Sequence, residues 1–169
     1  MKIIFYGGRQ AGWTALMSCL ARGYEIVAVI PQDETIEIAA KSLDLPIFGL
    51  ASLDNSNFHE ELKKTGGEIF LCCHGKKIIR KNILDNFKCV NIHPCLWKYP
   101  GANPIERLLR DNERKISVAM HKMTDKVDKG DVIKELFKER TGKTVVEVYK
   151  ELYPLYEEIV GYLPTIEKK

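Results

Sequence analysis

Residues 90–105 read VNIHPCLWKYPGANPI, an apolar strand pattern that runs straight into a proline-rich loop. Asn91 and His93 are two residues apart, so on a strand their side chains leave the same face of the sheet. The amide offers fixed hydrogen-bond donors, and the imidazole can donate, accept or carry a proton near neutral pH. Such a pair can hold a developing oxyanion while the histidine handles a proton. A group that orients the ring must come from elsewhere in the chain.

Outward from this stretch, short apolar runs alternate with helical patterns along the first half of the chain. Strands are expected at residues 2–6, 25–30, 68–73 and 88–92, and the helices between them include 35–43, one around Phe58 and Leu62, and one carrying Trp13, Leu16, Met17 and Leu20. Continuous apolar strands that alternate with helices predict a parallel sheet covered on both faces. We therefore expect an α/β fold with a mostly parallel central sheet flanked by helices on both faces.

The second half of the chain has a different pattern. A helix is expected at 104–111, with Pro104 in its first turn. Two strands at 115–123 and 131–137 follow without a helix between them, which predicts a hairpin with a long connection. From residue 144 to the end the apolar residues keep a helical period, and Pro154 is expected to break or kink this helix.

Length and composition fit a single domain over residues 1–169. The net charge is +3, and basic and acidic residues are interleaved, so we do not expect a nucleic-acid partner. The five cysteines are odd in number and form no C-x-x-C pair, which argues against a disulfide framework and a zinc site. No long apolar stretch predicts a signal peptide or membrane span, so we expect a cytoplasmic protein with no membrane partner.

In an open α/β sheet, ligands bind outside the carboxyl ends of the strands. This rule selects four segments of the chain: the turn at 7–10, the turn at 31–34, the segment 74–78 and the loop 91–101. The loop between the last two strands offers the missing carboxylate, with Asp125 and Asp128 as candidates. Asp128 lies just before Gly130, where a tight turn can aim its side chain back toward the strand ends.

Each of these residues also has a purely structural interpretation. Asn91 and His93 can cap a sheet edge, and Asp128 can be a turn former. His121 alternates with Ala119 on a strand, and we expect it to be a packing histidine.

The glycine turn at residues 7–12 follows a strand and opens a helix, so its backbone amides can meet an anion. It is not a dinucleotide fingerprint, because Arg9 stands where the second glycine must let the backbone approach a pyrophosphate. Asp33, at the end of the second strand, keeps a dinucleotide-dependent oxidoreductase open as an alternative.

Three strings agree in order and spacing with one known family: NIHP at 91–94, KYPGANPI at 98–105, and SVAMH at 117–121 leading to VDKGDVI at 127–133. They resemble the formyltransferases that use 10-formyltetrahydrofolate, which include methionyl-tRNA, glycinamide ribonucleotide and sugar N-formyltransferases. The resemblance is specific over residues 68–133 and looser over the first strand and turn. It implies a Rossmann-like formyltransferase domain.

The resemblance also implies residue roles. Asn91, His93 and Asp128 fall on the family's catalytic positions, and no metal is implied. The pterin pocket is expected to be lined by Gly75, Lys76, Lys77 and Ile78 on one wall and by Asp125 and Val127 on the other. Lysines 76 and 77 stand where apolar residues are common in the family, and Cys95-Leu96-Trp97 replaces the usual Ser-Leu-Leu-Pro. Substrate contacts are expected from Gly8, Arg9, Gln10 and Tyr99.

For the acceptor we expect a small molecule with a primary amine, an amino sugar nucleotide first. The alternatives are methionyl-tRNA, for which the family adds a C-terminal domain not expected here, and glycinamide ribonucleotide, for which a Gly-Ser-Asn turn would replace Gly-Gly-Arg-Gln. A formyltetrahydrofolate hydrolase and a non-catalytic folate-binding module also stay open. We expect a monomer or a homodimer.

Overall fold

The computed structural model describes residues 1–166, and the last three residues of the expected C-terminal helix lie outside them. Its centre is a six-stranded sheet in the order β2-β1-β3-β4-β5-β6. The strands are β1 (Lys2–Gly7), β2 (Glu25–Pro31), β3 (Ile69–Cys73), β4 (Lys88–Pro94), β5 (Lys115–Lys122) and β6 (Val132–Glu139). The first four run parallel, whereas β4, β5 and β6 pair antiparallel. The predicted mixed, mostly parallel sheet and its terminal hairpin are confirmed.

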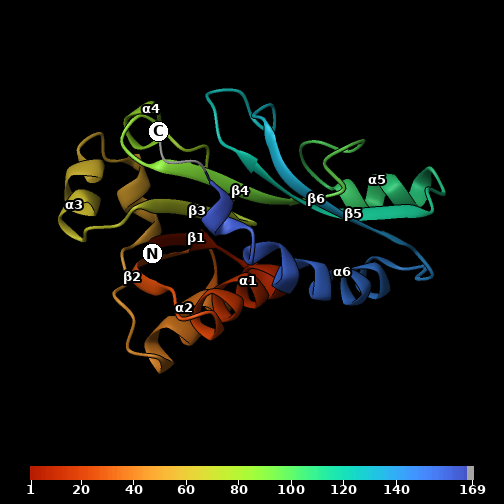
Figure 1. The fold of residues 1–169 in the computed structure, drawn as a ribbon, viewed down its shortest axis with the longest axis horizontal. Helices are drawn as coiled ribbons and strands as arrows, with labels where there is room; N and C mark the ends of the chain where they lie inside the picture. The colour runs from red at the N-terminus through yellow and green to blue at the C-terminus, as the bar shows by residue number, and fades with distance from the viewer. Residues whose placement is uncertain (167–169) are drawn as a thin grey trace.

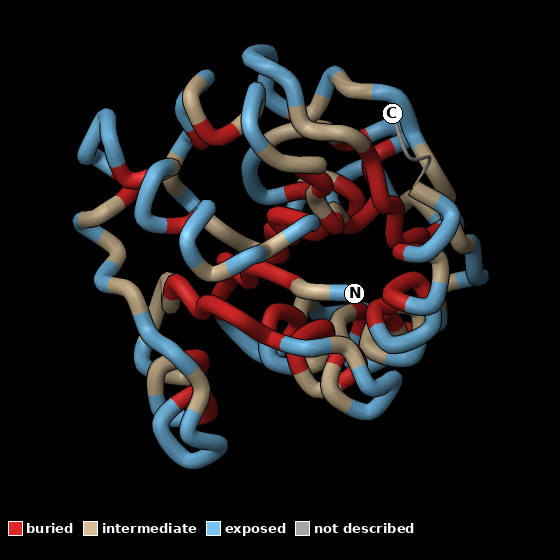
Figure 2. Tube along the Cα trace, turned by 60° about the vertical axis from the view of Figure 1, so that its left-hand side comes forward, coloured by how far each residue is buried: buried red, intermediate tan, exposed pale blue. Residues whose placement is uncertain are grey.

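Helices cover both faces of this sheet, as Figure 1 shows. One face carries α1 (Arg9–Ala21), α2 (Glu34–Ser42), α5 (Pro104–Arg110) and α6 (Val145–Val160), whose apolar residues join the larger core cluster. The other face carries the 3₁₀ turn η1 (Leu50–Asp54), α3 (Phe58–Lys64) and α4 (Lys81–Leu84). A short 3₁₀ turn, η2 (Leu163–Thr165), follows α6. The strands β1, β2 and β3 are almost entirely buried between these two layers (Figure 2). Apolar side chains leave both of their faces.

The cysteines belong to this core. All five are free and buried, where a thiol packs as a small apolar side chain.

Pro154 does not break the last helix, so of the predicted break or kink, the break was wrong. The helix α6 runs from Val145 to Val160 with Pro154 inside it. Pro154 and Lys150, four residues earlier, are both exposed, so water can satisfy the carbonyl that loses its helical partner. A capping box between Thr144 and Glu147 fixes the start of the helix.

Candidate active site

The register of β4 gathers polar side chains at one point of the sheet. Asn91 lies opposite Cys72 on β3 and opposite His121 on β5. Residues that pair across neighbouring strands point to the same face, so the amide and the second imidazole face each other. The Nδ2 atom of Asn91 is 3.1 Å from Nε2 of His121. His93 lies two residues further along β4, toward the carboxyl end of the strand.

Asp128 reaches this point from the loop between β5 and β6. Its backbone is left-handed, with a φ of 55°, a conformation that aspartate tolerates better than most residues. Gly130 packs so closely that a Cβ atom there would be 1.9 Å from the carbonyl oxygen of Lys122. The tight turn predicted from the sequence therefore exists, and it depends on a glycine that has no side chain to displace the end of β5.

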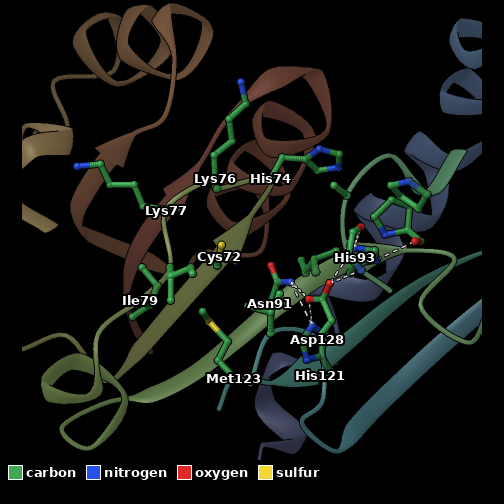
Figure 3. Close-up of a pocket in the computed structure, with 18 of the residues that line it drawn as sticks. Cys72, His74, Lys76, Lys77, Ile79, Asn91, His93, His121, Met123 and Asp128 are labelled. Atoms are coloured by element: carbon green, nitrogen blue, oxygen red, sulfur yellow. Dashed lines mark hydrogen bonds and ion pairs between the residues drawn. The ribbon is translucent and has the colours of Figure 1, made fainter. Parts of the chain in front are cut away.

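Four groups hold the carboxylate of Asp128. The backbone N–H of Gly101 donates to Oδ2 at 2.7 Å, and Nε2 of His93 is 3.2 Å from the same oxygen. Asn91 Nδ2 donates to Oδ1 at 3.4 Å, and Nε2 of His121 is 3.5 Å from that oxygen. Figure 3 shows these side chains converging from two strands and a loop. The amide, the ring and the carboxylate predicted from the sequence are in contact.

The surroundings of Asp128 keep it ionised. Burial raises the pKa of this carboxyl, but the hydrogen bonds from His121 and Gly101 and the charge of His93 outweigh burial and lower the pKa to about 2. The side chain is 8% exposed. A carboxylate that stays charged in so dry a place acts as a fixed negative pole for the rings beside it.

His93 faces acceptors at both ring nitrogens. Nδ1 lies 2.8 Å from the carbonyl oxygen of Pro94, and Nε2 lies 3.1 Å from that of Gly101 and 3.2 Å from Oδ2 of Asp128, so a neutral ring can donate at only one of the two nitrogens. Burial lowers the pKa of His93 below its usual 6.5, and the negative charge of Asp128 partly opposes this shift. The ring is therefore neutral at rest near pH 7, and its Nε2 is placed to take up or share a proton during a reaction.

His121 is the contact that sequence reasoning missed, because it was assigned to packing. Its Nδ1 lies 2.9 Å from the carbonyl oxygen of Lys122, and its Nε2 faces both Asn91 and Asp128. His121 is 2% exposed and lines the cavity described next. The strand parity of SVAMH gave no sign of this role, because only the β4–β5 register shows which residue lies opposite Asn91.

A cavity of about 470 Å³ opens beside the cluster. Its lining includes most of the side chains that the sequence predicted: Asn91, His93, Asp128, Gly75, Lys76, Lys77, Ile78, Val127 and Arg9. Other lining residues were not predicted, among them Cys72, Ile79, Met123, Glu106 and Tyr149. Apolar side chains thus lie at the cavity's inner side next to a few convergent polar groups, which is typical of a small-molecule site.

Four predicted site residues lie elsewhere. Gly8, Gln10 and Asp125 are sequence neighbours of residues that line the cavity, but they do not line it themselves. The ring of Tyr99 is 2% exposed and packs inside the larger core cluster, so its position does not support a substrate contact. The string around Tyr99 reads as a loop, and nothing in the sequence shows that its aromatic side chain turns inward.

Asp33 has a structural role at the turn after β1. Its Oδ2 accepts from the backbone N–H of Arg9 at 2.6 Å, and its Oδ1 accepts from Ile36 at the start of α2. A Cβ on Gly8 would be 2.7 Å from the same carboxylate. Because a carboxylate of the protein already meets this turn, the position weakens the dinucleotide alternative, which needs the turn for a pyrophosphate and Asp33 for a ribose.

Within residues 1–166 no group of three or more histidine, cysteine or acidic side chains is arranged to hold a metal ion. No helix in that range is both long and apolar enough to cross a bilayer.

Comparison with known proteins identifies the family. The model of the family described as formyl transferase matches residues 1–152. A methionyl-tRNA formyltransferase of Protochlamydia amoebophila (strain UWE25) is 30% identical over 80% of this chain and 48% of its own length. This chain therefore spans about half the length of the curated relatives it matches.

Solved structures share the fold. A phosphoribosylglycinamide formyltransferase from Campylobacter jejuni superposes with a TM-score of 0.81 at 18% identity, covering 98% of this chain and 95% of that one. A formyltetrahydrofolate deformylase from Pseudomonas syringae has a TM-score of 0.78 at 14% identity, over 95% of this chain and 58% of the other. With the match to the family model over most of the sequence, the chain belongs to the formyl transferase family.

Proposed function

We propose that the protein transfers a formyl group from 10-formyltetrahydrofolate to a primary amine. One observation carries this proposal: Asn91 and His93 both contact Asp128, and all three residues line a partly apolar cavity. The family assignment and the family's donor support it. The pterin would lie between the segment 75–78 and the loop 124–128, which both contribute residues to the lining of this cavity.

The residues have distinct tasks in this reaction. The amine nitrogen attacks the formyl carbon, the new C–N bond forms, and the bond from that carbon to N10 of the folate breaks. His93 takes up the proton that the attacking amine loses, and the imidazolium so formed donates from Nε2 to the oxygen that becomes negative. Asp128 stabilises this charged ring, and the same proton finally passes to N10 of tetrahydrofolate as the bond from the formyl carbon to N10 breaks.

Asn91 adds a second donor to the oxyanion. In the free protein its Nδ2 donates to Oδ1 of Asp128 at 3.4 Å and lies 3.1 Å from Nε2 of His121. The longer contact is the one that can be exchanged for the oxyanion, whereas His121 keeps the amide group in place. Catalysis then needs a small turn of one amide and no movement of the sheet.

For the acceptor, the comparisons favour an alternative over the amino sugar nucleotide expected first. The sequence relatives described above are named methionyl-tRNA formyltransferases. Asp33 also occupies the amide of Arg9, an amide that a phosphate at this turn would need. This arrangement disfavours glycinamide ribonucleotide bound by its phosphate at that turn. We therefore propose the amine of an aminoacyl ester, as in methionyl-tRNA, as the acceptor.

The test is to follow the labelled formyl group of 10-formyltetrahydrofolate. Parallel reactions contain methionyl-tRNA, glycinamide ribonucleotide, an amino sugar nucleotide or no acceptor. We expect label in formylmethionine after the ester is hydrolysed, with tetrahydrofolate released in equal amount. Transfer of the label to another acceptor would contradict the proposed acceptor but not the proposed reaction. Label released only as formate would indicate a hydrolase, and unreacted donor with all acceptors would contradict the proposal.

A further inference from the structure

The segment 75–78, one wall of the cavity, is held from behind by two side chains. The backbone N–H of Lys76 donates to Oε1 of Gln32 at 2.8 Å, and that of Lys77 donates to the hydroxyl of Tyr6 at 2.8 Å. The Tyr6 hydroxyl in turn donates to Oε1 of Gln32 at 2.7 Å. Two consecutive amides of the wall and two side chains thus form one closed hydrogen-bond network.

Packing fixes the same segment a second time. A Cβ atom on Gly75 would be 2.2 Å from the ring of Tyr6, so the backbone of residue 75 lies directly against the ring. Tyr6 is completely buried on β1. Burial raises its pKa to about 12, so its hydroxyl keeps the proton that it donates to Gln32. The wall cannot shift toward the sheet without displacing a core side chain.

Gln32 is itself anchored to the strands. It directly follows β2, and its backbone N–H donates to the carbonyl of Gly7 at the end of β1 at 2.7 Å. Its side-chain oxygen then accepts from both Tyr6 and Lys76. The wall is therefore tied to the carboxyl ends of the two adjoining strands.

These contacts determine which groups of the segment 75–78 face a ligand in the cavity. The N–H groups of Lys76 and Lys77 point into the protein, and both lysine side chains point away from Asp128 (Figure 3). The backbone of the segment is left facing the cavity. This accounts for lysines at two positions that are commonly apolar in the family, because the wall's shape is set by what lies behind it.

We propose that Tyr6 and Gln32 are positioning residues for the folate, which fix the wall at 75–78 so that the formyl carbon meets Asn91, His93 and Asp128. This inference rests on the proposed function and adds two residues to it. Neither side chain lines the cavity, so both act through the backbone of Lys76 and Lys77.

Binding of tetrahydrofolate to the full chain, measured by calorimetry, tests the proposal. Tyr6→Phe keeps the ring against Gly75 and removes only the hydroxyl, so we expect a Kd about tenfold higher, the size expected for lost buried hydrogen bonds. Gln32→Met should act similarly, whereas Gln32→Glu keeps an accepting oxygen and should stay within about threefold of wild type. The double variant Tyr6→Phe with Gln32→Met should be less than additive, because both act on one network.

A matched control separates positioning from general stability. Tyr24→Phe removes a hydroxyl just before β2, at the end of the sheet away from the cavity, and should leave Kd unchanged. With folate saturating, the acceptor KM of Tyr6→Phe should equal that of wild type. A Kd for Tyr6→Phe within about twofold of wild type, or equal losses for folate and acceptor, would overturn the proposal.

Amide hydrogen exchange gives a readout that needs no ligand. In Tyr6→Phe the amides of Lys76 and Lys77 should exchange at least about tenfold faster, because their acceptors are lost or loosened. Unchanged exchange rates of these two amides in Tyr6→Phe would overturn the proposed role of Tyr6, whether or not folate binds. Faster exchange together with no folate binding by the wild type would contradict the proposed function while leaving the network as described.

Discussion

Asp128 is the side chain on which the chemistry depends most directly. Asp128→Asn keeps the shape and the left-handed backbone that asparagine also tolerates, but it removes the charge that stabilises a protonated His93. We expect turnover to fall by about 10²–10⁴-fold while folate still binds. The measurement is steady-state formyl transfer alongside a binding isotherm.

Asp131→Asn is the matched control for this change. Asp131 is exposed in the same loop and does not line the cavity, so its variant should keep wild-type turnover. Near-normal turnover in Asp128→Asn would remove Asp128 from the mechanism.

The carboxyl group of Asp128 also makes the free energy of unfolding depend on pH. The folded pKa of Asp128 is about 2, below the ordinary value of 3.8. The contribution of its carboxylate to the free energy of unfolding is therefore fully present above about pH 4 and is lost as the pH falls toward 2. We expect the difference in free energy of unfolding between wild type and Asp128→Asn to shrink by about 2 kcal/mol over that range. Urea unfolding at several pH values measures it, and a difference that does not change with pH would show that Asp128 is not held by its neighbours.

The loop between β5 and β6 has to deliver Asp128, and Gly130 is its tightest point. Gly130→Ala would place a methyl group against the carbonyl of Lys122 and push the loop away from β5. We expect formyl transfer to fall at least about tenfold although residue 130 touches no substrate, since misplacing a catalytic group by about 1 Å is costly. Kinetics of the purified variant checks this.

Gly49→Ala is the control for a glycine substitution. A Cβ at Gly49 meets nothing within 4 Å, and the φ of −65° suits alanine. If both variants kept full activity, the turn would not position Asp128.

We expect the contribution of His74, the residue directly after β3, to the free energy of unfolding to be lost in acid. Burial, together with the positive charges of His93 and Arg9, lowers the pKa of His74 to about 4. Its Nε2 is 2.7 Å from the hydroxyl of Tyr156 on α6. Because the unfolded chain protonates near 6.5, the contribution of neutral His74 is complete above that pH and is lost as the pH falls to about 4.

His74→Asn removes the titrating group and tolerates the φ of 59° at this position. Wild type should lose on the order of 2 kcal/mol between pH 6.5 and 4 that the variant does not lose, allowing for partial exposure. Melting temperatures across this range give the comparison. Parallel pH profiles for the two proteins would show that His74 does not titrate in this way.

The architecture of the molecule was largely predictable because local patterns determine it. Apolar runs alternating with helices indicate a parallel sheet, and the missing helix between 115–123 and 131–137 indicates the hairpin. Asn91 and His93 followed from strand parity. His121, Tyr6 and Gln32 did not, because their roles come from register and from contacts between segments far apart in the chain.

Pro154 and Tyr99 are positions at which the packing of the whole chain overrides what the sequence predicted. Local rules predicted a broken or kinked helix at Pro154, and the family resemblance implied a substrate contact at Tyr99. Whether a proline's unpaired carbonyl faces water, and whether a loop tyrosine turns inward, depends on how the whole chain packs.

The most direct measurement is a crystal structure of the protein with tetrahydrofolate bound. The pterin should lie between the segment 75–78 and the loop 124–128, with N10 next to Asn91, His93 and Asp128. Folate bound outside this cavity, or a pterin there with N10 turned away from Asp128, would contradict the assignment of these three residues to formyl transfer.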